Sequence, residues 1–193
     1  MSLLLWVVLA VVVLGLYLLY ASIVTKKNKV AEALASIDVQ LTQRHDLIPN
    51  VLAIAKRFME HERGLMDDVT ALRTKASQSV GVQDPAQIGA KFAAENQLGA
   101  QFGKLMAVAE SYPALKSDGP MIEAQKTYAE VETNIAAARR FYNSAVGELR
   151  NAVQIFPGSL VAGLAGAGSP PPFFEANADD RAPVDAASLL AAG

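Results

Sequence analysis

The sequence contains no cysteine, and histidine occurs only at positions 45 and 61. Disulfides, thiolate catalysis and cysteine-ligated metal sites are therefore excluded. Thr42 and Phe58 stand three residues before the two histidines, so the Glu-x-x-His pairs of di-metal helical bundles are missing. Gly-rich phosphate loops and the G-x-S-x-G elbow of hydrolases do not occur either. We therefore expect no cofactor, no metal and no enzymatic activity, and an unrecognised hydrolase is the least favoured class.

Long basic runs are also missing. The chain has 17 Lys and Arg against 19 Asp and Glu, and its basic cluster is Lys26, Lys27 and Lys29. This balance argues against nucleic acid as a partner. We expect the three lysines to contact anionic lipid head groups, an effect of about 1 kcal/mol each near a charged membrane surface.

Charge is absent from residues 3–24. As a helix this run would be about 33 Å long, enough to cross a hydrocarbon layer of roughly 30 Å. A cleavable signal peptide is the alternative, but its apolar region usually has about 7–15 residues and follows a basic segment. Here the run is longer and no basic side chain precedes it. The sequence therefore predicts a retained, single-pass transmembrane helix over residues 3–24.

The flanks of this helix predict its orientation. The three lysines follow it directly, and the positive-inside rule then places the C-terminal domain in the cytoplasm. Trp6 near one end, and Tyr17 and Tyr20 near the other, suit the aromatic belts of the two membrane interfaces. The lipid bilayer is thus the first partner that we expect.

The remaining residues, about 169, are enough for one domain with a core, and their apolar period is helical throughout. We expect the first helix to run from the membrane to about Arg44. A second would start near Asp46 as N-cap, with Pro49 in its first turn, and run to about Ser79. The first would rise about 28 Å above the membrane and the second would be about 50 Å long. This mismatch requires a tilted bundle, a broken helix, or a span that stands partly above the membrane.

Two more helices follow. Gly81 marks a break, Asp84 and Pro85 predict a capped start, and the third helix should end around Tyr112, before a loop over residues 116–120. The fourth has apolar residues spaced by seven, with a second row beside them: Tyr128, Ile135, Tyr142, Leu149 and Phe156, then Val131, Ala138, Ala145 and Ala152. Such rows form coiled-coil-like seams. The fold class is therefore all-α, a transmembrane helix continuing into an antiparallel four-helix bundle over residues 25–156.

Antiparallel order should return Phe156 to the membrane. Residues 157–175 are apolar and Gly-rich, and we interpret them as a loop that caps the bundle. The alternative is a membrane-interface foot, for which the candidate residues are Leu160, Val161 and Leu164, together with the three lysines. Residues 176–193 have little apolar bulk and predict a disordered tail.

Polar residues lie around the expected first turn. Arg44, Asp46 and Asn50 are a candidate partner surface at the membrane-distal end, and the alternative is that they cap and pair to fix the turn. Four carboxylates flank the apolar stripes and should pair with Arg139, Arg140 or Lys104 rather than catalyse a reaction: Asp38, Glu62, Glu95 and Glu132.

Several stretches together resemble the LemA family. They are Ser36-Ile37-Asp38-Val39-Gln40-Leu41, Arg44-His45-Asp46-Leu47-Ile48-Pro49-Asn50-Val51, His61-Glu62, Glu110-Ser111-Tyr112-Pro113-Ala114-Leu115-Lys116, Glu132-Thr133-Asn134-Ile135, Ala138-Arg139-Arg140-Phe141-Tyr142-Asn143, Phe156-Pro157-Gly158-Ser159-Leu160-Val161-Ala162 and Pro172-Phe173-Phe174-Glu175. The resemblance implies one N-terminal membrane segment, a helical bundle, a bacterial cell (inner) membrane location and no established enzymatic activity. The chain departs from the family at residues 163–168, where relatives often carry an aromatic side chain and the one large residue here is Leu164.

The sequence thus favours a non-enzymatic, membrane-anchored interaction or assembly platform, with self-association or other membrane proteins as partners. The alternative is a regulatory partner of a membrane protease or of an envelope stress-sensing system. Affinity capture from solubilised membranes would separate the two.

Overall fold

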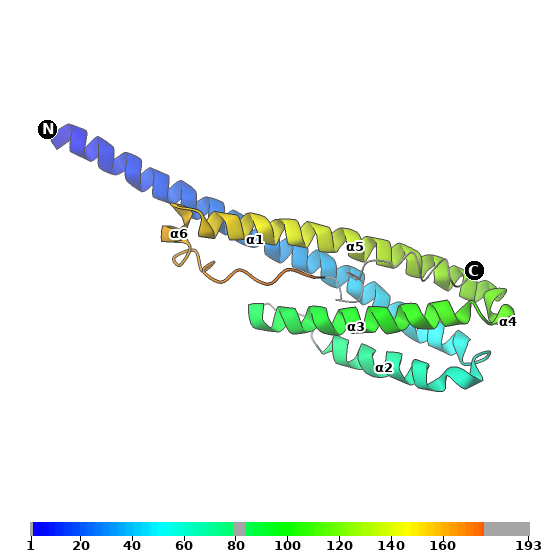
Figure 1. Cartoon of the computed structure of the whole chain (residues 1–193). Helices are drawn as coiled ribbons and strands as arrows, with labels where there is room; N and C mark the ends of the chain where they lie inside the picture. The colour runs from blue at the N-terminus through cyan, green and yellow to red at the C-terminus, as the bar shows by residue number, and fades with distance from the viewer. Residues whose placement is uncertain (1, 79–83, 176–193) are drawn as a thin grey trace, which may run out of the picture.

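The structure, a computed structural model, describes residues 2–78 and 84–175 of the chain. Over these residues it is entirely helical, without a strand (Figure 1). In chain order the elements are α1 (Ser2–Ala55), the 3-10 turn η1 (Glu60–Glu62), α2 (Arg63–Ser77), α3 (Pro85–Ala109), α4 (Pro113–Lys116), α5 (Gly119–Gln154) and α6 (Gly158–Val161). The predicted all-α fold is confirmed.

α1 is one helix of 54 residues that carries the apolar N-terminal run and then enters the bundle (Figure 1). The predicted turn near Asp46 is wrong, because the helix continues through Pro49 to Ala55. A proline lacks the N–H that would bind the carbonyl oxygen four residues earlier, which belongs to His45. The Nε of Arg73, on α2, lies 2.9 Å from that oxygen and supplies the donor. The helix can therefore pass through the proline.

The chain reverses after α1, within residues 56–62, rather than at residue 45. α2 consequently has 15 residues, about 22 Å at 1.5 Å per residue, instead of the expected 50 Å. The expected second helix is thus broken at residues 56–62, and its first part belongs to α1. This break, one of the three explanations that the sequence left open, accounts for the mismatch in length.

The start of α3 is as predicted. Pro85 occupies its first position, and the side chain of Asp84 accepts a hydrogen bond of 3.2 Å from the backbone N–H of Ala86. The expected break at Gly81 lies outside the described residues. The predicted loop over residues 116–120 is too long, because α5 already begins at Gly119. Pro120 lies in its first turn, where a helix needs no N–H donor.

α1, α2, α3 and α5 alternate in direction, and this confirms the predicted antiparallel four-helix bundle (Figure 1). α5 packs along α1, and α2 packs on α3. Two edge-to-face ring pairs join α3 to α5, Phe92 with Tyr142 at 5.3 Å and Phe102 with Tyr128 at 5.0 Å between centroids.

The predicted rows of α5 form its buried face, except at the end. Ile135, Tyr142 and Leu149 are buried, as are three members of the second row, Val131, Ala138 and Ala145. Phe156 is 74% exposed because α5 ends two residues before it, at Gln154.

The apolar core consists of two clusters along the bundle axis. One contains α1 residues from Ile23 to Leu41, and the other begins on α1 at Ile48. The α1 residues between them that are buried are Arg44 and His45. With Lys91 and Glu95 of α3 they are the buried polar side chains of the described chain, and the core is therefore interrupted by a charged layer.

Residues 157–175 lie along the outside of the bundle (Figure 1). α6 turns back at the end of α5, and Val161, Ala162, Ala165 and Ala167 are buried against the first core cluster. Residues 170–175, here named the strap, then run along α3 and α5. The predicted tail, residues 176–193, lies outside the described residues.

Candidate membrane-interface site

One end of the bundle lies beside the point where α1 leaves it, and its surface is apolar. Four large apolar side chains there are between 64% and 80% exposed: Ile155, Phe156, Leu160 and Leu164. On the rest of the described bundle the exposed large apolar side chains are scattered, at Val39, Ile122 and Phe141. Gathered apolar side chains of this kind mark interaction sites with proteins or membranes.

The part of α1 that stands free of the bundle is short. Its large apolar side chains from Leu3 to Leu18 are between 41% and 80% exposed. Leu19 packs partly on the core, and Ile23 is 2% exposed. Residues 3–18 extend about 24 Å, less than the roughly 30 Å of a hydrocarbon layer. A span of full thickness would therefore include the next turn of α1, where Leu19 and Ser22 line one groove with Ile155 and Phe156 of the bundle end.

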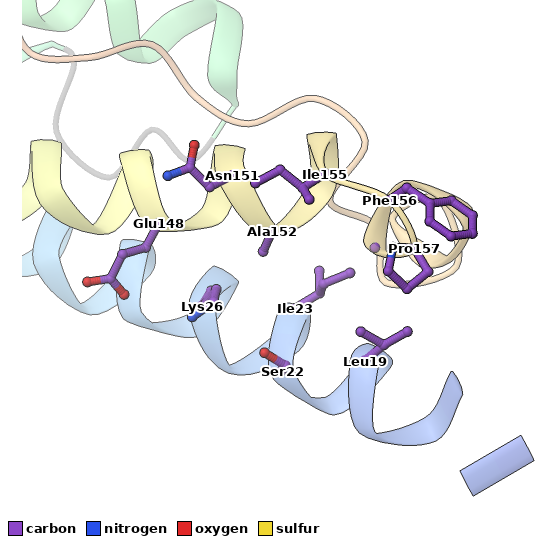
Figure 2. Close-up of a pocket in the computed structure, with 11 residues that line it drawn as sticks. Leu19, Ser22, Ile23, Lys26, Glu148, Asn151, Ala152, Ile155, Phe156 and Pro157 are labelled. Carbon is purple, nitrogen blue, oxygen red and sulfur yellow. The ribbon is translucent and has the colours of Figure 1, made fainter. Parts of the chain in front are cut away.

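A groove of about 420 Å³ opens at this end between α1 and the last turns of α5 (Figure 2). Each wall is one face of a helix, with residues at positions i, i+3, i+4 and i+7. These residues are Leu19, Ser22, Ile23 and Lys26 on α1, and Glu148, Asn151, Ala152 and Ile155 on α5. Because the two helices are antiparallel, Lys26 and Glu148 share one end of the groove, and Leu19 and Ile155 share the other. The groove thus changes from polar to apolar along its length. Phe156, Pro157 and Gly158 line the apolar end.

The charges at the polar end are unequal. Lys29 donates to both carboxylate oxygens of Glu148, at 3.0 and 3.1 Å, and this bond and its charge hold the pKa of Glu148 below its usual range. Lys26 also favours the ionised form of Glu148 by its charge. Among the ion pairs within 4.0 Å in the described part of the chain, none contains Lys26. Its ammonium group is therefore available to a ligand.

The structure places the predicted interface residues at this end, with one difference. Leu160 and Leu164 are exposed, whereas Val161 is 5% exposed and packs on the core. Lys27 is exposed, and Lys26 and Lys29 are half-buried on α1. That these residues contact a membrane stays a prediction. Ile155 was not predicted, and Phe156 was expected at this end but in the core row of α5, whereas it is 74% exposed.

The charged layer in the middle of the bundle links three helices. Arg44, which is 3% exposed, donates to the Glu95 carboxylate at 2.5 Å and to its backbone oxygen at 2.9 Å. Its second nitrogen donates to Glu132 of α5 at 3.3 Å. The Nε2 of His45 lies 3.0 Å from the other Glu95 oxygen. Lys91 bonds to Asp38 in the same region.

Two opposing effects determine the pKa of Glu95. Burial alone would raise it, because the ionised form loses its hydration. The hydrogen bond with His45 and the charge of Arg44 outweigh burial, and the pKa lies below the usual 4.5. The Glu95 carboxylate is thus held ionised between two nitrogen donors. The partners expected from the sequence, Arg139, Arg140 and Lys104, are wrong for this carboxylate.

The three residues of the candidate partner surface do not share one surface in the structure. Arg44 lies inside the bundle, and Asp46 and Asn50 are exposed on α1. Neither lies at a turn, since α1 continues past both. Whether Asp46 and Asn50 bind a partner stays a prediction.

The strap is held by main-chain and ring contacts. Asn143 donates to the backbone oxygen of Phe174 at 3.0 Å and accepts from its N–H at 2.8 Å. The Phe174 ring is stacked on Phe92, with centroids 4.0 Å apart, and the Arg139 guanidinium lies 4.2 Å from its centroid. Tyr142 donates to the backbone oxygen of Pro172 at 3.0 Å, and burial raises the pKa of its hydroxyl. The strap therefore completes the first core cluster.

Comparison with protein families identifies the relatives of this chain. A model of the LemA family matches residues 33–186, which include most of the bundle and the strap. The chain belongs to the LemA family. Comparison with curated proteins gives no match. LemA membership agrees with the all-helical bundle and assigns no molecular role or partner to the chain.

Two further findings concern the site. α1 is the one helix of the described residues that is long and apolar enough to cross a membrane, and no part of its most apolar stretch is buried. In residues 2–78 and 84–175, His, Asp and Glu form no group of three that could hold a metal ion.

Proposed function

We propose that this LemA protein is a single-pass membrane protein whose non-enzymatic bundle rests on the bilayer and serves as an interaction or assembly platform. One observation carries the proposal. The free part of α1 is about one turn too short to span the hydrocarbon layer alone, and the surface beside the missing turn is apolar. Anchoring by α1 then brings Phe156, Leu160 and Leu164 to the membrane interface as a second point of attachment.

Two points of attachment fix how the bundle stands. A single helix lets a domain rotate and tilt, whereas an apolar contact beside it holds one orientation. Burial of Phe156, Leu160 and Leu164 in the membrane stabilises this orientation by roughly 25 cal/mol per Å² of apolar surface removed from water. The rest of the long bundle would then project from the bilayer and present its sides to partners, Asp46 and Asn50 among the exposed residues.

The three lysines support a cytoplasmic position for the bundle. They lie about two to three turns beyond the free part of α1, and their positive charge favours the cytoplasmic side. A bacterial inner membrane, whose inner surface is negatively charged, suits both the lysines and the resemblance to the family.

Alkaline extraction of membranes that contain the full chain tests the anchor. We expect the protein to remain in the pellet, as integral proteins do, and release into the supernatant would contradict the proposal. Crosslinking in intact cells from Asn50→Cys, followed by capture, tests the platform. Crosslinked dimers or one reproducible membrane-protein adduct are expected, and the second result would favour a regulatory role. Monomer alone, at every crosslinker length, would contradict a platform on this face.

A further inference from the structure

The groove between α1 and α5 has the shape and polarity of a lipid site. Its volume of about 420 Å³ lies within the range of about 300–1,000 Å³ that is typical of small-molecule sites. Leu19, Ile23 and Ile155 line the apolar end, and Lys26 stands at the polar end (Figure 2). A water-filled apolar groove beside a membrane would be unfavourable.

The direction of this gradient matches a bilayer. The apolar end lies toward the N-terminal span, and the polar end lies toward the body of the bundle (Figures 1 and 2). A phospholipid of the adjoining leaflet has the same order, with its chains toward the hydrocarbon layer and its phosphate at the surface. The groove is continuous with the free part of α1, so a lipid needs no passage through water to enter it.

The charge around the polar end selects among phospholipids. Lys26 and Lys29 both act on one carboxylate, that of Glu148, and this carboxylate is paired with Lys29. The ammonium of Lys26 is left for a phosphate diester. Charge-assisted bonds of lysine to phosphate are stronger than neutral ones, and the surplus positive charge favours a lipid with net negative charge.

We propose that this groove binds one anionic phospholipid, its acyl chain along Leu19, Ile23 and Ala152 and its phosphate at Lys26. The inference rests on the proposed membrane anchoring and names the ligand of the same site. A bound lipid would fill the space between α1 and α5 and join the bundle to the leaflet. The occupant is drawn from the membrane, and free phosphate is not the ligand.

Native mass spectrometry of the full chain, released from nanodiscs of phosphatidylcholine and phosphatidylglycerol in equal amounts, tests the inference. The wild type should retain one phosphatidylglycerol. Lys26→Gln should reduce retention about tenfold, as expected for the loss of one bond to a charged group. Lys27→Gln is the matched control, since it removes the same charge one residue away, outside the groove lining, and should retain the lipid. Equal losses in both variants would show general attraction to a charged surface and overturn the site.

A second variant tests the apolar wall. Ala152→Trp places a large ring in the groove, and retention should fall while helical circular dichroism is unchanged. Undiminished retention in this variant would overturn the site. Inorganic phosphate added to the wild type should not displace the lipid, and displacement would assign the polar end to free phosphate. Alkaline extraction of the same samples separates the two proposals. A chain that stays in the membrane without retaining lipid refutes only the lipid site, whereas a chain that is extracted refutes the anchoring as well.

Discussion

The Nε of Arg73 lies 2.9 Å from the carbonyl oxygen of His45, the oxygen that Pro49 leaves without a partner inside α1. This bond crosses from α2 to α1 and permits a 54-residue helix to contain a proline. α1 continues past the proline to Ala55, and the chain reverses after that residue.

The first prediction concerns this bond. Arg73→Met removes the donor and leaves a carbonyl oxygen unpaired in a half-buried place, so it should lower the free energy of unfolding by about 1–3 kcal/mol. Pro49→Ala restores a helical N–H to the same oxygen. In the Pro49→Ala background the cost of Arg73→Met should therefore fall to a few tenths of a kcal/mol, measured by urea denaturation. Equal costs in both backgrounds would show that Arg73 stabilises the bundle by other contacts.

The second prediction concerns pH. The pKa of Glu95 in the folded protein is below its usual 4.5. The stabilisation from its ionised form is therefore fully present above pH 4.5 and is lost as the pH falls through the lowered folded pKa. Thermal melts should show a fall in Tm below pH 4.5 that is smaller in Glu95→Gln. The control Asp67→Asn changes an exposed carboxylate and should keep the pH profile of the wild type. A profile for Glu95→Gln that parallels the wild type would contradict the assignment.

The third prediction compares two adjacent phenylalanines of the strap. Phe174 is 1% exposed and stacked on Phe92, so Phe174→Ala should cost about 3–5 kcal/mol. Phe173 is half-buried beneath Arg150, whose guanidinium lies 4.3 Å from its centroid. Phe173→Ala should cost about 1 kcal/mol. Chemical denaturation measures both, and equal costs would mean that the strap does not complete the core.

The fourth prediction uses two helical glycines. A Cβ at Gly99 would lie 2.7 Å from a guanidinium nitrogen of Arg44, which Glu95 and Glu132 hold in place. A Cβ at Gly147 meets nothing within 4 Å. Gly147→Ala should therefore stabilise the protein by up to about 1 kcal/mol through helix propensity, and Gly99→Ala should destabilise it. A stabilising Gly99→Ala would show that Arg44 can move without cost.

Local patterns in the sequence predict the elements that depend on local chemistry. The cap at Asp84, the proline after it and the buried rows of α5 are examples. The path of α1 could not be predicted in the same way. An aspartate followed three residues later by proline is typical of a helix start, and the arginine that changes this outcome lies 24 residues beyond the proline.

Part of the candidate site could also be predicted from the sequence. Leu160 and Leu164 were candidates in the alternative of a membrane-interface foot; both are exposed in the structure, and their contact with a membrane stays a prediction. Sequence spacing did not show that α5 ends before Ile155, or that Val161 faces the core. The groove requires two helices whose residues are more than a hundred positions apart, and no single pattern predicts which of their faces meet. The pairing of Arg44 with Glu95 was missed for the same reason.

The central claim is that the end of the bundle formed by α5 and α6 rests on the membrane that α1 crosses. The chain has no cysteine, so a spin label can be attached at one chosen position of the full protein in vesicles. Electron paramagnetic resonance then measures collisions of the label with oxygen, which dissolves in lipid, and with a water-soluble nickel chelate. Labels at Leu160→Cys and Leu164→Cys should favour oxygen, and a label at Asn50→Cys should favour nickel. Preference for nickel at all three positions would place this end of the bundle in water and contradict the account.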